Sequence, residues 1–335
     1  MLIIHNMDNR YKETFLFFDE GPHRYTDSFG NEYRSVTTLI GDYYPHFDAD
    51  YWAHKKAKEQ GKSEKAIKAE WDKIRIEACE RGTKTHNGLE DAIKEVSKFK
   101  NAIRYLTDAA SGRVITIADI PALIPKPLNI DEFKEATENK YPEIYRVFDY
   151  YTQRGYIIYS EIGAFLMDYL ISGTIDIFCY RPSDFVILDW KTNRDGLKFE
   201  AGYYKKDKST VPNQLTDQWV KKKQMMLPPL SHVEDCNGEH YTMQLSLYAL
   251  MAEIILDIPC RGLGLCHIGS PWIKNAYGQP YRDKDGYHVD PNGEETVNWY
   301  RINYRKKEAQ ALLMDRAYKL RANSLNNVKQ LNLFQ

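Results

Sequence analysis

Apolar positions along the chain recur with two spacings, one typical of helices and the other of strands. Residues 63–98, 130–154, 241–256 and 305–321 have helical spacing, and the first of these predicts one long helix or a helix interrupted near Gly82. β-Rich runs cover residues 156–165, 170–180, 185–190, 261–268 and 296–304. Residues 15–33 predict a strand and hairpin with a turn at 29–31, and Ser35 then opens a short helix.

The order of these elements predicts an α/β fold in which helices flank a central mixed β-sheet, with a helical N-terminal part. Residues 194–240 are polar, rich in lysine and broken by prolines, so we expect an insertion that leaves the core. No internal repeat and no clear linker divides the chain. We therefore predict a single domain over residues 1–322 and a flexible tail over residues 323–335.

Composition narrows the class of protein without identifying a partner. The 335 residues are 43% hydrophobic, which is ample for a core, and 47 acidic residues nearly cancel 46 basic ones, so any nucleic-acid binding must use local patches. The five cysteines lack C-x-x-C spacing, which argues against a zinc site or a disulfide framework and favours a reducing cytosol. Residues 1–10 lack a signal-peptide core, and no run approaches the roughly 20 apolar residues of a membrane span, so we expect a cytoplasmic protein with no membrane partner.

The most informative stretch is a predicted β-hairpin over residues 173–191. If the loop residues 181–184 are symmetric about the turn, the register places Asp176 directly opposite Asp189. Because side chains alternate along a strand, Lys191 lies on the same face as Asp189 and diagonal to Asp176. Two carboxylates facing each other at roughly 5 Å repel, and a divalent cation between them is the natural explanation.

A plainer interpretation is a solvated sheet face that carries one ordinary Asp/Lys cross-strand pair. The neighbouring residues argue against it, because the strands around these charges are apolar: Ile175, Ile177, Val186, Ile187 and Leu188. In strands that are central and partly buried, an unpaired ion costs several kcal/mol. We therefore expect a functional reason for the buried charge.

An ordered set of motifs in this chain resembles the PD-(D/E)XK nuclease superfamily, in particular RecB-type exonucleases. The G-x-x-D, D-x-K and Q-x-x-x-Y motifs of that group match Gly173-Thr-Ile-Asp176, Asp189-Trp-Lys191 and Gln244-Leu-Ser-Leu-Tyr248. An upstream histidine motif matches Gly82-Thr-Lys-Thr-His86 with Glu90, and the glutamate that often precedes the G-x-x-D strand matches Glu161. Residues 23–37 also resemble the entry segment of phage and mitochondrial relatives. The resemblance spans roughly residues 23–250, and its specificity lies in the order of the motifs.

This resemblance implies a restriction-endonuclease-like core and a metal-dependent active site. It implies one or two Mg²⁺ or Mn²⁺ ions held by Asp176, Asp189, the main-chain carbonyl of Trp190, Glu161 and His86, a choice that suits oxygen-rich ligands. The metal would acidify a bound water, while Lys191 would orient that water or stabilise the transition state. Glu161 and Gln244 join the catalytic set, and Tyr248 is expected to contact DNA. The iron-sulfur relatives have four suitably spaced cysteines, which this chain lacks, so no cluster is expected.

Each accessory residue also has a simpler interpretation. His86 and Glu90 are four apart and share a helical face, so they suit a structural pair as well. Glu161 suits an exposed strand position, and Tyr248 suits the buried face of its helix. Gln244 has the stronger functional claim, because an amide within an apolar helix needs a partner.

Two further segments suggest partners. The insertion combines Tyr203, Tyr204 and Trp219 with lysines that suit DNA phosphates, namely Lys205, Lys206, Lys221, Lys222 and Lys223, although a merely solvated loop fits as well. Near the C-terminus, Gln330-Leu-Asn-Leu-Phe334 resembles the bacterial sliding-clamp-binding pentapeptide, with Leu331, Leu333 and Phe334 as anchors. The alternative is a tail that packs on its own domain.

These observations predict a Mg²⁺- or Mn²⁺-dependent deoxyribonuclease, an exonuclease rather than an endonuclease, in a bacterial or phage-infected cell. Its partners would be DNA, with single-stranded or duplex ends, and the sliding clamp. A catalytically silent nucleic-acid-binding adaptor on the clamp is the alternative, which the complete set of two acids and a lysine disfavours. A hydrolase that acts on another substrate through its carboxylate pair leaves Lys191 unexplained.

Overall fold

The computed structural model describes residues 10–19, 21–97, 112–123 and 126–332. Its helices are α1 (Arg10–Glu13), α2 (Val36–Gly41), α3 (Ala49–Gln60), α4 (Glu64–Val96), η1 (Ile117–Ala122), α6 (Ile130–Ala136), α7 (Pro142–Thr152), η2 (Met167–Tyr169), α8 (Asn237–Leu256) and α9 (Lys306–Asn332). Its strands are β1 (Leu16–Asp19), β2 (Arg24–Asp27), β3 (Glu32–Ser35), β4 (Arg113–Val114), β5 (Ile157–Leu166), β6 (Ile171–Arg181), β7 (Asp184–Lys191), β8 (Gly202–Asp207), β9 (Gln214–Lys221), β10 (Cys260–Gly269) and β11 (Thr296–Ile302).

The described residues form one nine-stranded sheet and a separate two-stranded hairpin, β8–β9. The order in the large sheet is β11-β10-β7-β6-β3-β2-β1-β4, and β5 also pairs with β6. The sheet is mixed, because β10 runs parallel to β7 and β3 runs parallel to β6 while the other pairs are antiparallel. The predicted α/β fold with a central mixed sheet flanked by helices is confirmed.

Strand β7 is buried on both faces, which explains its nearly continuous apolar sequence. Phe185 and Ile187 pack into one core with helix α8, whereas Leu188 and Trp190 pack into a second core with α4, α6 and α7. This alternation is the period of a β-strand. The catalytic candidates therefore lie on a rigid strand between two hydrophobic layers.

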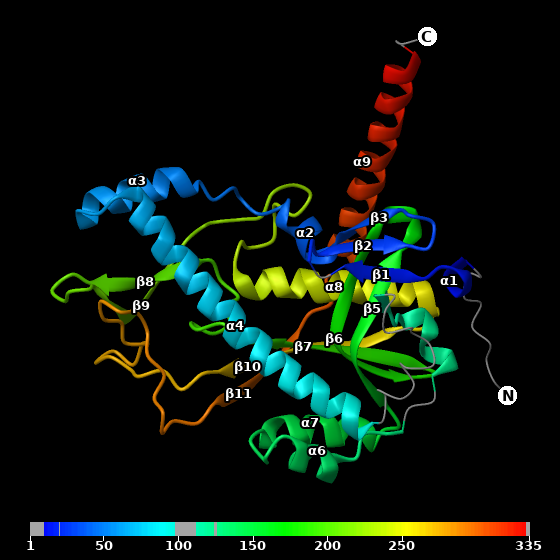
Figure 1. Cartoon of the computed structure of the whole chain (residues 1–335), viewed down its shortest axis with the longest axis horizontal. Coiled ribbons are helices and arrows are strands. Elements are labelled where there is room, and N and C mark those ends of the chain that lie inside the picture. Colours follow the sequence, from blue (N-terminus) through cyan, green and yellow to red (C-terminus); the bar gives the residue numbers. More distant parts are fainter. Residues whose placement is uncertain (1–9, 20, 98–111, 124–125, 333–335) are drawn as a thin grey trace.

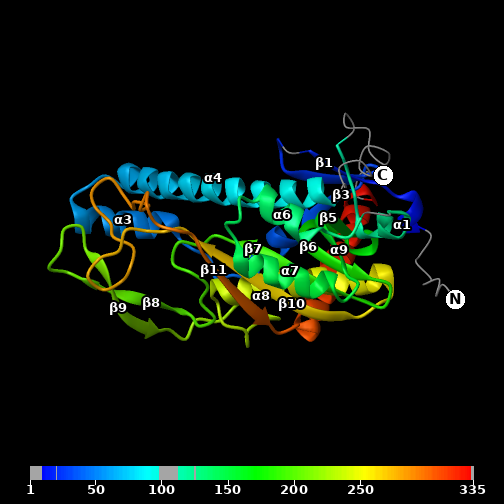
Figure 2. The same ribbon diagram turned by 90° about the horizontal axis from the view of Figure 1, so that it is seen from below.

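Helix α4 is continuous, which confirms the first of the two predicted alternatives, one long helix, over an interruption near Gly82. Ser63 caps its N-terminus by accepting a hydrogen bond from the N–H of Ala66. Gly82 serves close packing instead, because a Cβ at this position would lie 3.1 Å from Oγ1 of Thr192, directly after β7. In Figure 1, α4 crosses the sheet, and Figure 2 shows it running along the molecule from the α3 end.

Other boundaries differ from the sequence-based prediction. Residues 130–154 form two helices, because Glu138 and Asn139 adopt left-handed conformations that end α6 before Pro142 starts α7. The insertion contains β8–β9, which both views place at the same end of the molecule as α3.

The last helix is longer than predicted. Helix α9 continues to Asn332, so most of the segment expected to be a flexible tail is helical. It projects away from the sheet towards the C-terminus (Figure 1). Among the described residues, no helix is long and apolar enough to cross a membrane.

Candidate active site

The hairpin β6–β7 has the predicted register but a tighter turn. Ile177 pairs with Leu188 and Arg181 pairs with Asp184, so only Pro182 and Ser183 form the turn. Continued by one residue, this register places Asp176 opposite Asp189. There the ladder ends, and the main-chain N–H of Trp190 donates to Oδ2 of Asp176 at 3.1 Å. The Asp176 carboxylate thus joins the two strands where they separate.

Glu161 reaches the same place from strand β5. Its neighbours Ser160 and Ile162 pair with Ile177 and Ile175, so Glu161 lies level with Asp176. Its φ of 56° is left-handed, a conformation that costs a non-glycine residue about 1–2 kcal/mol. Strain of this kind is typical of functional sites, where surrounding structure holds it. The predicted position of Glu161 beside Asp176 therefore agrees with the geometry.

Helix α4 brings His86 and Glu90 to the acidic residues. The Nδ1 atom of His86 lies 3.6 Å from Oδ2 of Asp176. Glu90, one turn further, is only 7% exposed and hydrogen-bonds to Glu161. Burial lowers the pKa of His86, and the charge of Lys191 lowers it further. A neutral imidazole is the form that binds metals.

Burial shifts the pKa of the acidic groups upwards. It raises the pKa of Asp176 to about 6, against the opposing charge of Lys191. The pKa of Asp189 rises to about 7, through burial and then the charge of Asp176. Burial and the Glu161 charge raise the pKa of Glu90 to about 9. Without a cation, Glu90 therefore stays protonated at neutral pH, Asp189 is partly protonated, and Asp176 is mainly ionised.

Lys191 supplies the positive charge of the cluster. Its ammonium forms an ion pair with Oδ2 of Asp189 and lies 4.5 Å from the ring centroid of Tyr241 on α8. Burial works against the charge, but Asp189 and Asp176 outweigh burial and raise the pKa of Lys191. Directly after the strand, Asn193 donates to the hydroxyl of Tyr241 at 2.9 Å and its carbonyl lies 2.7 Å from Nε2 of His267. These hydrogen bonds anchor the segment that follows β7 to α8 and β10.

Helix α8 places Gln244 and Tyr248 against strand β6. Gln244 hydrogen-bonds to Tyr248, which is 4% exposed and whose pKa is raised well above its usual value, mainly by burial. Burial of this ring suits the alternative, a core residue, whereas the expected DNA-binding role of Tyr248 stays a prediction from sequence. The lack of a side chain at Gly173 makes room for it, because a Cβ there would lie 2.5 Å from the Tyr248 hydroxyl oxygen.

Gly173→Ala is expected to lower the free energy of unfolding by about 1–3 kcal/mol, the usual cost of overpacking a core. The added methyl group meets the Tyr248 ring, so Tyr248→Leu in the same chain should recover part of the loss. Gly262→Ala is the control, because its Cβ would lie 3.9 Å from the nearest atoms of Val186. Chemical denaturation measures all four proteins. Equal stability of Gly173→Ala and Gly262→Ala would contradict this packing.

The donor set fits a hard divalent cation. Asp176, Asp189 and Glu161 offer carboxylate oxygens, and His86 offers a neutral nitrogen. Among the described residues, no three His, Cys, Asp or Glu side chains already lie close enough together to hold a metal ion. A divalent charge would remove the repulsion between carboxylates that raises the pKa of Asp189.

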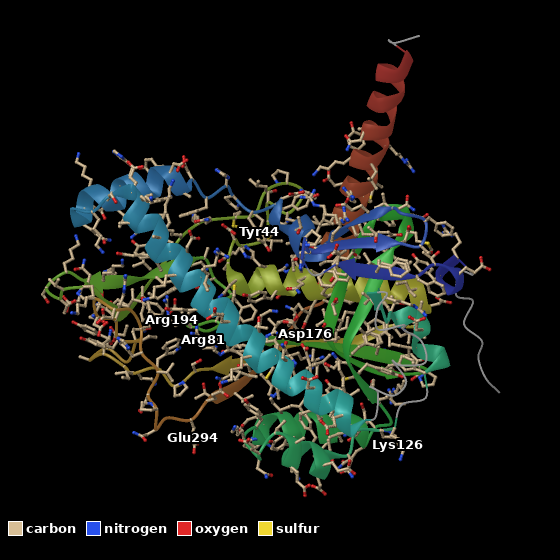
Figure 3. All side chains as sticks on the ribbon, viewed as in Figure 1. Tyr44, Arg81, Lys126, Asp176, Arg194 and Glu294 are labelled. Carbon is tan, nitrogen blue, oxygen red and sulfur yellow. The ribbon has the colours of Figure 1, made fainter. Side chains whose placement is uncertain are left out.

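The sequence-based prediction missed two arginines, Arg81 and Arg194, beside the acidic cluster. Arg81 lies one residue before the close contact at Gly82, and Arg194 lies three residues after Lys191; Figure 3 shows both on the β8–β9 side of Asp176. Burial lowers the pKa of Arg81, and the neighbouring charge of Arg194 lowers it further. The Arg81 guanidinium lies 4.7 Å from the Trp272 ring, and its buried Nε has no partner among the described residues.

A cavity of about 930 Å³ continues from Arg194 into the inserted segment. Its lining includes the predicted Lys205 and Lys206, together with Lys198, Lys208, Tyr203, Tyr204, Trp219 and Tyr287. Burial lowers the pKa of Lys206, and the like charges of Lys56 and Arg282 lower it further. Strand β8, helix α3 and the segment between β10 and β11 therefore bring cations together here. Such a site attracts anions.

The other predicted lysines lie outside this cavity. Lys221 forms ion pairs with Glu200 and Glu234 at 3.1 and 3.3 Å, and Lys222 lies 5.0 Å from the ring centroid of Tyr203. Lys223 is exposed. None of these three lines the cavity, so the DNA-binding prediction is best supported at Lys205 and Lys206.

The clamp-binding prediction is not tested by the structure. Gln330 and Leu331 fall within the range of α9, whereas Leu333 and Phe334 lie outside the described residues. Comparison of the chain with protein-family models, with curated proteins and with solved structures found no match.

Proposed function

We propose that this protein is a metal-dependent nuclease of the PD-(D/E)XK type with a restriction-endonuclease-like core, which hydrolyses phosphodiester bonds in DNA. The observation that carries the proposal is the meeting of the buried Asp189, the partly buried Asp176 and Lys191 at the end of β6–β7. Glu161 and His86 approach the same carboxylates from β5 and α4. Burying this many charged groups costs free energy, which a bound cation and a catalytic role would explain.

Each residue has a role that its position supports. Asp176, Asp189, Glu161, the Trp190 carbonyl and His86 would hold Mg²⁺ or Mn²⁺. When bound, the cation supplies positive charge that polarises the phosphate and makes a nearby water more acidic. Lys191 would orient that water or stabilise the charge that develops on the phosphate. Gln244 would act indirectly, by holding Tyr248 under the strand that carries Asp176.

Arg81 and the cavity lined by Lys205 and Lys206 favour a nucleic acid over a smaller phosphodiester as the substrate. Arg81 lies on the cavity side of Asp176, where its guanidinium suits a phosphate next to the cleaved one. Arg194 lines the cavity and is paired with Asp195 at 2.6 Å. The cavity then offers lysines for further phosphates and rings for bases. An exonuclease that draws a strand end through this path is the favoured form, and recruitment to a sliding clamp through the C-terminal segment stays a prediction from sequence.

The direct test is digestion of 5′- and 3′-labelled single-stranded, duplex and circular DNA with Mg²⁺, with Mn²⁺ and with a chelator. The nuclease proposal expects degradation that needs the divalent cation, and resistance of circles would identify an exonuclease. Binding of DNA without any cleavage would instead favour the silent adaptor. Parallel digestion of RNA checks the preference for DNA.

Replacing Arg81 with alanine is expected to raise the DNA concentration for half-maximal cleavage about tenfold, since one charge-assisted phosphate contact is lost. The slope of the logarithm of the binding constant against the logarithm of the salt concentration should also become smaller by about one, because one phosphate contact is lost. Arg75→Ala is the matched control, because Arg75 lies on the same helix but is exposed and paired with Asp72. Cleavage rates over a range of DNA concentrations, and fluorescence anisotropy at several salt concentrations, measure both variants. Equal behaviour would show that Arg81 does not contact DNA.

A further inference from the structure

A second basic cavity lies at the other end of the hairpin β6–β7. It has a volume of about 660 Å³, within the range of small-molecule pockets. Helix α7, the β6–β7 turn and strands β10 and β11 surround it, and none of its lining residues belongs to the acidic cluster. Its position at the edge of the sheet makes it distinct from the proposed path of DNA.

Arginines form the rim of this cavity. Arg181 is neutralised by Asp184, to which it donates two hydrogen bonds at 2.9 Å. Arg261 lies 3.8 Å from the same carboxylate, which Arg181 already occupies. Arg154 and Arg301 also line the cavity, and neither forms an ion pair with a carboxylate in the described part of the chain. The rim therefore carries an excess of positive charge that suits an anion.

The floor of the cavity is apolar and open because strand β10 has glycines there. Gly262 and Gly264 carry no side chains over β7, so Val186 and Leu188 are left as the floor. A Cβ on Gly262 would still lie 3.9 Å from Val186. An apolar floor beneath a charged rim suits a ligand with one flat apolar part and one anionic part.

Aromatic rings form the walls. Tyr151 comes from α7 and Trp299 comes from the edge strand β11. The Nε1 of Trp299 is buried and has no hydrogen-bond partner among the described residues, so Trp299 contributes its ring to the wall. On the rim, the Arg154 guanidinium lies 3.6 Å from the Tyr150 ring centroid, which fixes its plane.

The geometry points to a binding site for a nucleoside phosphate, with the base on the apolar floor beside Trp299 and the phosphate at Arg301 and Arg154. Arginine recognises phosphate through paired N–H donors, and aromatic rings stack on bases of any sequence. The same chemistry is offered by a free nucleotide and by the terminal nucleotide of a nucleic-acid strand. The site stands independently of the proposed nuclease activity, because it uses none of the same residues.

Isothermal titration of the full chain with dAMP, inorganic phosphate and deoxyadenosine, in the presence of a chelator, tests this site. dAMP should bind at least about tenfold more tightly than either part alone, because each part fills only one half of the cavity. A 5′-phosphorylated trinucleotide distinguishes the two sources. Comparable affinity for dAMP and the trinucleotide indicates a free nucleotide, whereas much tighter trinucleotide binding indicates a strand terminus.

Two variants separate this cavity from other anion sites. Arg301→Ala should weaken dAMP binding about tenfold by removing a phosphate donor, and Gly262→Val should weaken it at least as much by filling the floor. Arg146→Ala is the control, because Arg146 lies on α7 outside the cavity and pairs with Glu143. The inference is overturned if dAMP binds no better than deoxyadenosine, or if both cavity variants bind it as the wild type does.

Discussion

Replacing Lys191 with alanine is expected to reduce the rate of DNA cleavage about 10²–10³-fold, the effect of removing one charge-stabilising group from an active site. The ammonium is held by Asp189 and beside Tyr241, and the two aspartates raise its pKa, so it is charged at neutral pH. Because the side chain is already fixed before substrate arrives, its charge needs no reorganisation during the reaction. The measurement is single-turnover cleavage of labelled DNA with Mn²⁺.

The control must show that the loss is chemical and not structural. Lys134→Ala removes a half-exposed lysine that pairs with Asp131 on α6, outside the hairpin and the acidic cluster, and this variant should cleave DNA normally. Lys191→Ala should retain its far-ultraviolet circular dichroism and its affinity for DNA. Cleavage at the wild-type rate by folded Lys191→Ala would remove the lysine from the mechanism and leave the nuclease assignment without its main support.

The part of the site that the sequence could predict depends on short-range periodicity. The register of β6–β7 follows from a short turn placed symmetrically between two adjacent strands, which is why Asp176 and Asp189 were placed opposite each other correctly. The spacing of His86 and Glu90 follows in the same way from the helical repeat. In both cases neighbouring residues along the chain determine which face a side chain occupies.

The rest of the site depends on contacts between distant segments, which periodicity does not encode. The left-handed conformation of Glu161 is set by its place between two paired residues of β5. Gly82 resembles a helix breaker in sequence, but the approach of Thr192 gives it another role. Arg81 and Arg194 come together only because α4 crosses the end of β7. The polar C-terminal part of α9, from residue 323, likewise resembles a disordered tail, yet it contains no glycine or proline that would end the helix.

In the absence of divalent cations, the thermal stability of the protein is expected to fall as the pH rises from about 5 to about 9. The pKa values of Asp176, Asp189 and Glu90 are raised to about 6, 7 and 9, whereas unfolded carboxyl groups titrate near pH 4. Across that window the folded chain binds more protons than the unfolded chain, so deprotonation favours unfolding. Mg²⁺ or Mn²⁺ would take the place of those protons, so stabilisation by the metal should grow with pH.

Thermal melts at about pH 5, 7 and 9, with a chelator and with Mn²⁺, measure both effects. Asp189→Asn removes one titrating group and one metal donor, so it should flatten the pH dependence and weaken the shift produced by Mn²⁺. Asp217→Asn, which changes an exposed carboxylate on β9, should leave both unchanged and so corrects for other titrating groups. A wild-type melting temperature that is insensitive to Mn²⁺ at high pH would show that these carboxylates do not hold a divalent ion. Because this readout needs no DNA, it tests the metal site separately from the reaction proposed for it.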